Sequence, residues 1–212
     1  MKIWTGQHRT DRWDSGEKIF WASSIHMHPD YDKKTFEHDV CILRVDDLEQ
    51  GMDLANNSVA DFACLPSGKK TFSKISTLTN RTLEHKIILE GQKVQEGTKC
   101  WTAGWGVTTT EKRGAKALQE VDLKMFDDAT CRATRLGNDF MDDSMICAGY
   151  ESGGYDACQG DSGGPLICAV DGEPILMGVT SWGYGCGVKG SPGVWAEIGH
   201  KNVLDWIYPM LN

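Results

Sequence analysis

One serine in this sequence is placed as a nucleophile would be. Ser162 lies in the stretch D-A-C-Q-G-D-S-G-G-P, residues 156–165, close to Gly160, Gly163 and Gly164. Glycine is used where the backbone takes unusual dihedral angles or comes close to a ligand. A serine hydroxyl in such a turn becomes a good nucleophile only when a base removes its proton. The stretch therefore predicts nucleophilic catalysis and requires a base elsewhere in the chain.

The bulk composition narrows the class of protein. The 212 residues are enough for one substantial domain or two fused halves with a real core. Apolar residues make up 40% of the chain and charged residues 25%, and the net charge is −8, as is ordinary for a globular protein. There is no run of Lys and Arg and no apolar run long enough to span a membrane. We therefore expect neither nucleic acid nor a membrane as a partner.

The cysteines point to an oxidising compartment. The chain has eight, spread along its length and without a C-x-x-C pair, which favours a disulfide framework over a zinc ribbon or a redox dithiol. Two glycosylation triplets, at Asn56 and Asn80, also fit a secreted protein. Met1 to Arg9 carry no hydrophobic segment typical of a signal peptide. Either the cysteines are reduced, or the chain has lost its beginning.

Short apolar or alternating segments separated by Gly-rich turns predict an all-β protein, a barrel or a sandwich. We expect strands at 17–27, 40–45, 99–106, 118–126, 165–169 and 175–182. The nearly continuous apolar run at 40–45 predicts a strand buried on both faces. Two short helices are expected, at 127–135 with Asp127 as N-cap and at 202–208 before Pro209. Residues 66–97 are interpreted as a long surface loop with one strand at 86–89.

Six motifs occur in an order that resembles one family. They are H-D-V-C-I-L around Asp39, C-W-T-A-G-W-G from Cys100, M-I-C-A-G-Y from Met145, the Ser162 stretch, S-W-G-Y-G-C from Ser181, and P-G-V-W from Pro192. Over nearly its whole length the sequence resembles the trypsin/chymotrypsin family of serine endopeptidases. The resemblance implies an all-β fold of two antiparallel six-stranded β-barrels, with the N-terminal barrel incomplete and a short C-terminal helix. One protease domain over 1–212 would comprise a partial barrel and long loop (1–95), a C-terminal barrel (96–200) and a helix (201–212).

The resemblance also implies catalytic roles. Ser162 matches the nucleophile, and the backbone N–H groups of Gly160 and Ser162 match the oxyanion hole, which faces the charge that develops on the scissile carbonyl. Asp39 matches the acid that holds the imidazole of the catalytic base in the correct tautomer.

Substrate binding follows from the same resemblance. Asp156 matches the floor of the primary specificity pocket, where a carboxylate pairs with Arg or Lys of the substrate. Gly183 and Gly193 match the pocket walls and leave room for a long side chain. Ala157 offers no hydroxyl beside the floor, which favours Arg over Lys. The segment Ser181, Trp182 and Gly183 matches the edge that pairs with the substrate backbone.

The resemblance pairs six of the cysteines: Cys100 with Cys168, Cys131 with Cys147, and Cys158 with Cys186. Cys41 lies in the apolar run and is interpreted as a reduced core cysteine. Cys64 resembles a family cysteine that bonds an upstream propeptide, and a Cys41–Cys64 bond is the alternative.

The family's base is a histidine in an A-A-H-C context, and none of the six histidines has that context: His8, His26, His28, His38, His85 and His200. The I-V-G-G-like start, whose amino group pairs with the acid matching Asp161, is missing too. Asp161 is then expected to be a buried acid without its partner. The chain as given is expected to be inactive or nearly so, as an N-terminally incomplete protein would be.

The remaining expectations concern partners and cofactors. The resemblance implies a secreted monomer that cleaves proteins or peptides after Arg or Lys and meets protein inhibitors. No cofactor is expected. Residues 6–17 resemble the family's calcium loop, with Asp14 and Glu17 as oxygen ligands, but the neutral Gln7 stands where a carboxylate is usual and weakens the site. The alternative function is a non-catalytic homologue that binds peptides or partners. The missing histidine favours it, and the intact Ser162, Gly160, Asp156 and Asp39 argue against it.

Overall fold

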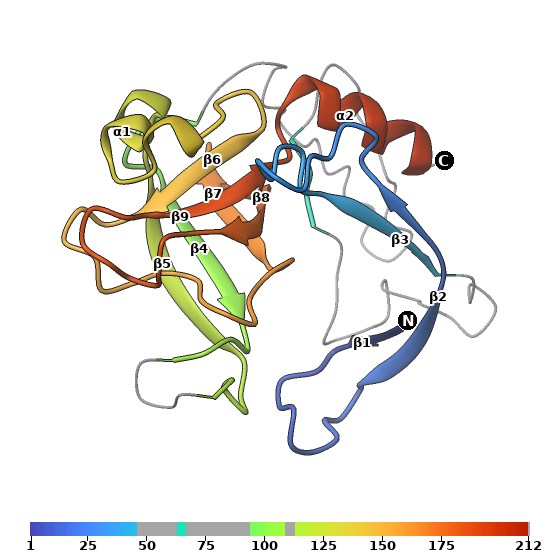
Figure 1. Ribbon diagram of the computed structural model, residues 1–212. Coiled ribbons are helices and arrows are strands. Elements are labelled where there is room, and N and C mark those ends of the chain that lie inside the picture. Colours follow the sequence, from blue (N-terminus) through green and yellow to red (C-terminus); the bar gives the residue numbers. More distant parts are fainter. Residues whose placement is uncertain (46–62, 67–93, 109–112, 212) are drawn as a thin grey trace.

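The computed structural model describes residues 1–45, 63–66, 94–108 and 113–211, and within these ranges the protein is built mainly from β-strands. Figure 1 shows two units, a closed barrel and a smaller open sheet. The strands are β1 (Lys2–Thr5), β2 (Lys18–Met27), β3 (Cys41–Val45), β4 (Lys99–Gly104), β5 (Gln119–Met125), β6 (Met145–Gly149), β7 (Pro165–Val170), β8 (Glu173–Trp182) and β9 (Gly193–Glu197). The helices are α1 (Asp128–Ala133), α2 (Lys201–Ile207) and the 3-10 turns η2 (Gly137–Asp139) and η3 (Tyr208–Leu211).

The C-terminal half forms a closed six-stranded barrel in the order β4-β5-β6-β9-β8-β7. Every pairing in it is antiparallel, and β4 meets β7 with Cys100 opposite Cys168. Burial alternates along strand β5 as expected, with Leu123 and Met125 buried and Asp122 and Lys124 exposed. Closure leaves no free strand edge in this half, so the barrel can carry a site on a rigid support.

Strands β6 and β9 are buried at every residue. Their outer faces are covered by α1 and the turn after it, through a cluster of Cys131, Leu136, Phe140, Met145, Cys147 and Val194. Both segments carry motifs of the resemblance, but neither was predicted as a strand from the sequence. Burial on both faces removes the apolar–polar alternation by which a strand is recognised.

The N-terminal half is a three-stranded antiparallel sheet in the order β1-β2-β3. Along β2, Trp21, Ile25 and Met27 are exposed and alternate with more buried residues. Cys41 is paired with Met27 in register and is also exposed. The predictions of a strand buried on both faces and of a core cysteine are therefore wrong. Every residue of β3 is exposed or half-buried, and Cys41 is one of the exposed residues.

Helix α2 packs near the start of β3, as Figure 1 shows. Val203, Leu204 and Ile207 form one cluster with Val40 and Ile198, and Ile42 packs against it. The helix ends at Ile207, and Pro209 lies in the following 3-10 turn. The expected N-cap of α1 is also present, since the Asp127 side chain accepts a hydrogen bond from the Thr130 N–H at 2.6 Å.

Three disulfides join Cys100 to Cys168, Cys131 to Cys147, and Cys158 to Cys186, the pairs that the resemblance implied. Cys41 and Cys64 are not bonded to each other, so the alternative disulfide is not formed. The strand expected at 86–89 lies outside the described residues. Among the described helices, none has the length and apolar character needed to cross a membrane.

Candidate functional site

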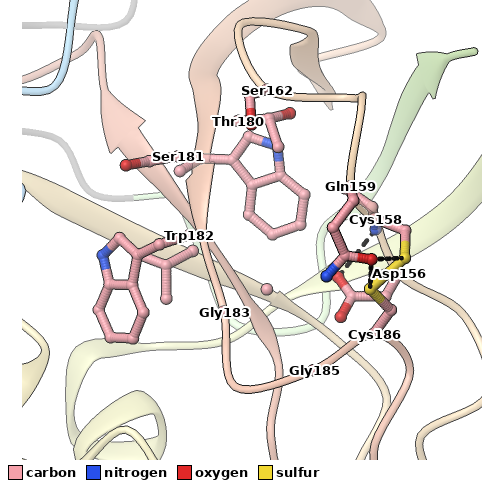
Figure 2. Close-up of a pocket in the computed structure, with 14 residues that line it drawn as sticks. Asp156, Cys158, Gln159, Ser162, Thr180, Ser181, Trp182, Gly183, Gly185 and Cys186 are labelled. Atoms are coloured by element: carbon pink, nitrogen blue, oxygen red, sulfur yellow. Dashed lines mark hydrogen bonds between the residues drawn. A yellow bond between two sulfur atoms is a disulfide. The ribbon is translucent and has the colours of Figure 1, made fainter. Parts of the chain in front are cut away.

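A pocket of about 210 Å³ opens at one end of the barrel. Figure 2 shows Ser162 and Asp156 at different ends of it, with the last residues of β8 along one side. The structure thus brings together the residues that the sequence analysis selected from three separate motifs: Asp156, Ser162, Ser181, Trp182, Gly183 and Gly193. The Cys158–Cys186 disulfide ties two segments of the lining to each other.

The turn that carries Ser162 is held by backbone hydrogen bonds. Gly160 and Gly163 take positive φ values of 101° and 82°, which favour glycine. The Gly163 N–H donates to the Thr180 carbonyl at 2.9 Å, and the Thr180 N–H donates to the Gly164 carbonyl at 2.8 Å. Ser162 itself is exposed. The N–H groups of Gly160 and Ser162 donate no hydrogen bond within the described residues, so they are available to a ligand.

The neighbouring acid, Asp161, anchors this turn from the inside. One of its carboxylate oxygens accepts from the Gly106 N–H at 2.7 Å, and the other accepts from the Cys158 N–H at 2.9 Å. A Cβ atom added to Gly104 or Gly106 would overlap the carboxylate. The expectation of a buried acid without a partner was therefore incomplete, because the group is half-buried and satisfied by backbone amides.

Asp156 is the acid inside the pocket. Its carboxylate accepts from the Ala157 N–H at 2.8 Å and from the Gly187 N–H at 3.0 Å. Burial raises the pKa of Asp156 to about 6, against the lowering effect of the two amide hydrogen bonds. Such a group is ionised at neutral pH but poorly solvated, which favours pairing with a cation that enters the pocket.

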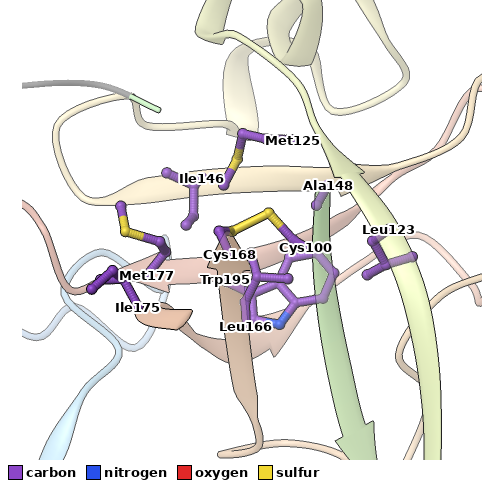
Figure 3. Close-up of a cluster of buried hydrophobic side chains, with 10 residues drawn as sticks. All are labelled: Cys100, Leu123, Met125, Ile146, Ala148, Leu166, Cys168, Ile175, Met177 and Trp195. Carbon is purple, nitrogen blue, oxygen red and sulfur yellow. A yellow bond between two sulfur atoms is a disulfide. The ribbon is translucent and has the colours of Figure 1, made fainter. Parts of the chain in front are cut away.

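The pocket wall next to Asp156 needs a glycine at position 193. A Cβ atom on Gly193 would overlap the Asp156 carboxylate and lie 2.7 Å from the Trp195 ring. A Cβ atom on Gly183 would make only ordinary contacts, the nearest at 3.5 Å. Trp195 is fully buried and lines both this pocket and the main core of the barrel, where Figure 3 shows it beside Leu166 and the Cys100–Cys168 disulfide. The pocket is therefore supported directly by the core.

Asp39 reaches the same end of the barrel from the other half of the chain. The Ser181 hydroxyl donates to its carboxylate at 2.6 Å. No histidine ring is hydrogen-bonded to Asp39 or Ser162 within the described part of the chain. His28, His38 and His200 gather on the side of α2 instead, and His85 lies outside the described residues. The structure thus joins Asp39 to the pocket through Ser181, a contact that the sequence analysis did not foresee.

Comparisons with known proteins identify the family of this chain. The trypsin family model matches residues 1–207. The chain belongs to the trypsin family. It is 32% identical to cationic trypsin-3 of Rattus norvegicus over 98% of this chain and 69% of that protein, and 34% identical to trypsin-1 of Astacus astacus over 92% and 68%. It is also 33% identical to serine protease 56 of Homo sapiens over 90% of this chain but only 27% of that longer protein.

The loop between β1 and β2 was expected to resemble the trypsin family's calcium loop. The Asp14 carboxylate accepts from the His8 N–H at 2.8 Å and the Arg9 N–H at 2.6 Å, and these bonds lower its pKa. Glu17 is buried and accepts from the Asp14 N–H at 2.9 Å, while its second oxygen has no partner within the described residues. Calcium needs several oxygens pointing inward, whereas amide N–H groups converge on Asp14 here. Among the described residues, no group of three or more His, Cys, Asp or Glu side chains is placed to hold a metal ion.

Several residues that shape the trypsin-family site were missed from sequence. Gly104 and Gly106 make room for Asp161, Thr180 fixes the Ser162 turn, and Trp195 supports the pocket. The two glycines carried a usable signal, since both lie in the quoted motif C-W-T-A-G-W-G. Thr180 and Trp195 gave no signal that separates them from ordinary strand residues.

The two wall glycines allow a matched test of the pocket. We expect Gly193→Ala to destabilise the protein by about 1–3 kcal/mol, because the added methyl group overlaps Asp156 and the Trp195 ring. Gly183→Ala should change the stability by less than about 0.5 kcal/mol, since its Cβ meets only ordinary contacts. Chemical unfolding followed by circular dichroism measures both. Equal losses in the two variants would contradict the described geometry.

Proposed function

We propose that this chain carries the machinery of a serine endopeptidase that hydrolyses peptide bonds after Arg or Lys through an acyl-enzyme. The observation that carries the proposal is the single pocket that joins the exposed Ser162 hydroxyl to the Asp156 carboxylate. Ser162 lies at the mouth of the pocket and Asp156 lies inside it. This arrangement suits a substrate whose Arg or Lys side chain enters the pocket while the carbonyl group of that same residue meets Ser162.

The catalytic roles rest on the turn geometry. Ser162 attacks the scissile carbonyl, forms the acyl-enzyme and releases the amine, and water then hydrolyses the ester. The unused N–H groups of Gly160 and Ser162 bind the oxygen on which negative charge develops. Such donors act because they are already oriented, and losing one typically costs about a hundredfold or more in rate. The positive φ of Gly160 supports this role, because it places the peptide N–H without a side chain in the way.

The specificity rests on Asp156. An apolar side chain in the pocket would leave this poorly solvated carboxylate without a cation, so the pocket favours Arg and Lys over apolar residues. Ala157 adds no hydroxyl beside the carboxylate, which favours the larger guanidinium. Ser181, Trp182 and Gly183 line the mouth, where a substrate backbone would run.

Among the described residues, no histidine is placed as a proton acceptor for Ser162. Asp39 is bonded to the Ser181 hydroxyl, and none of the described imidazoles is hydrogen-bonded to Ser162. We therefore propose that this chain alone is nearly inactive, and that its Ser162 acts when an imidazole is supplied between Asp39 and Ser162. The substrates would be proteins or peptides, and the enzyme would be a secreted monomer open to protein inhibitors. The three disulfides favour an oxidising compartment.

Binding of p-aminobenzamidine tests the pocket without any catalysis. This amidine stays cationic between pH 5 and 8, so its affinity follows the charge of Asp156. With the pKa of free Asp156 at about 6, affinity should be flat above pH 7 and fall by about tenfold per pH unit well below 6, as a proton competes for the carboxylate. Fluorescence titration measures it. Asp156→Asn should abolish binding, and Glu173→Gln, at the exposed first residue of β8, should not. An affinity that does not depend on pH would contradict the assignment.

Chemical rescue tests the catalytic half. Imidazole added to the protein should raise hydrolysis of an arginine thioester in proportion to its concentration, because it can remove the Ser162 proton. Ser162→Ala, as the control, should show only the background reaction of imidazole with the thioester. Strong hydrolysis without imidazole that is lost on replacing one of the chain's own histidines would overturn the proposed missing base. Amidine binding without any rescue would favour the non-catalytic, peptide-binding homologue.

The loop between β1 and β2 is proposed to fold without calcium, since Asp14 is already satisfied by the amides of His8 and Arg9. Millimolar calcium should therefore shift the thermal unfolding midpoint by less than about 1 °C, and a chelator should leave it unchanged. Asp14→Asn should lower the thermal unfolding midpoint, because the hydrogen bonds from His8 and Arg9 lose their charged acceptor. Differential scanning fluorimetry with and without calcium decides. A rise of several degrees with calcium would contradict this.

A further inference from the structure

Two histidine rings lie stacked in the interior, between the Asp39 segment and α2. The ring centroids of His28 and His38 are 4.8 Å apart and the planes are inclined by only 12°. His28 is 3% exposed and His38 is 9% exposed. Neither ring takes part in the proposed chemistry. Burial and contact between two histidines both disfavour their charged forms, so we expect this pair to respond to acid.

The surroundings of His28 require its neutral form. The Asp30 N–H donates to Nδ1 at 3.2 Å, so Nδ1 must present a lone pair. The remaining proton is then on Nε2, which lies 3.5 Å from the Asn202 carbonyl of α2. The ring edge also meets Trp206 of α2, with centroids 5.0 Å apart. A second proton would go to Nδ1 and face a donor, which would break the contact with Asp30.

The stack is continuous with the backbone that places Asp39. His38 has a positive φ of 53°, which is unusual for a residue with a side chain and persists only when the surroundings hold it. The His28 N–H donates to the Val40 carbonyl at 3.0 Å. This hydrogen bond closes the loop that contains His38 and Asp39. The Asp39 side chain then reaches the Ser181 hydroxyl. The ring stack is what packs the strained residue in place.

We propose that His28 and His38 are positioning residues for Asp39, and that they hold it against Ser181 only while the stack is uncharged. Acid would protonate the stack, loosen α2 from the Asp39 segment and release the Asp39–Ser181 hydrogen bond. The inference uses the proposed function only to say why the place of Asp39 matters.

The charged groups around the stack set the direction of the effect. Burial lowers the pKa of His28, and the neighbouring His38 lowers it further, while the Asn202 carbonyl and Asp30 act in the opposite sense. From α2, His200 lies 6.3 Å from His38, and Lys201 is paired with Asp205. From the same loop, Glu37 is bonded to Thr35. Asp205 and Glu37 are thus bonded to other residues, and the attraction of Asp30 for a charged His28 is smaller than the effect of burial.

The sign of the pH dependence follows. The unfolded chain protonates His28 near its ordinary pKa of about 6.5, whereas the folded chain resists the proton to lower pH. The contribution of the stack to stability is therefore complete above about pH 7 and decreases as the pH falls below 6.5. The loss amounts to a tenfold change in the folding equilibrium for each pKa unit by which burial lowers the His28 pKa.

Nuclear magnetic resonance of the whole chain tests the proposal directly. Between pH 8 and 5 we expect the His28 ring carbons to titrate with a midpoint below 6.5. The Asp39 carboxyl carbon and the α2 amides should shift with the same midpoint, and hydrogen exchange of the α2 amides should accelerate by tenfold or more. Titration of His28 with no change at Asp39 or α2 would overturn the proposal. This measurement uses the unmodified chain and so does not depend on the folding of a variant.

Variants separate positioning from general stability. In His28→Gln, which cannot take up the proton, the shared step at Asp39 and α2 should disappear. In His8→Asn, whose histidine lies in the loop between β1 and β2, it should remain. Survival of the step in His28→Gln would overturn the proposal. Amidine binding at Asp156, measured at pH 7.5 in the same samples, reports on the proposed function separately, so either idea can fail while the other stands.

Discussion

The Asp161 carboxylate is the contact on which the site depends, because it joins the Ser162 turn to the barrel from within. Its two oxygens accept from Gly106 and Cys158, which belong to different segments of the chain. The side chain points inward and its successor, Ser162, points to solvent. The N–H groups of Gly160 and Ser162, which donate no hydrogen bond within the described residues, belong to the same turn, and glycine at position 160 allows its positive φ. Loss of this anchor would free the nucleophile and its oxygen-binding amides together.

The two halves of the molecule contribute to the site in different ways. The barrel is closed, crosslinked by three disulfides, and supplies the pocket, the acid and the serine from elements that already pack on Trp195. The three-stranded sheet supplies only Asp39, and it does so through a loop held by α2 and the histidine stack. The pocket can therefore keep its shape under conditions in which the Asp39 segment has moved.

Sequence alone identified much of this because the informative residues are unusual and close together. Gly160, Asp161, Ser162 and Gly163 mark a turn by composition, and Asp156 is only six residues away from the serine. Contacts between distant residues were beyond its reach: the Asp39–Ser181 hydrogen bond joins positions 142 apart, and no local pattern encodes it. Strands β6 and β9 were not predicted, because strands buried on both faces lack the alternation of apolar and polar residues. The apolar run at β3 led to a wrong prediction, since its sequence could not show that none of these five residues is fully buried.

Helix α2 packs on a sheet built from the first residues of the chain. Protein synthesis runs from the first residue to the last, so β2 and β3 leave the ribosome long before residues 201–207 exist. The core between Val40, Ile42 and α2 cannot form during that interval, and the left-handed backbone at His38 has nothing to hold it. The barrel also needs a late segment, because β9 closes it between β6 and β8 and lies directly before α2 in the chain. Neither half can therefore be complete until residues 193–207 have been made.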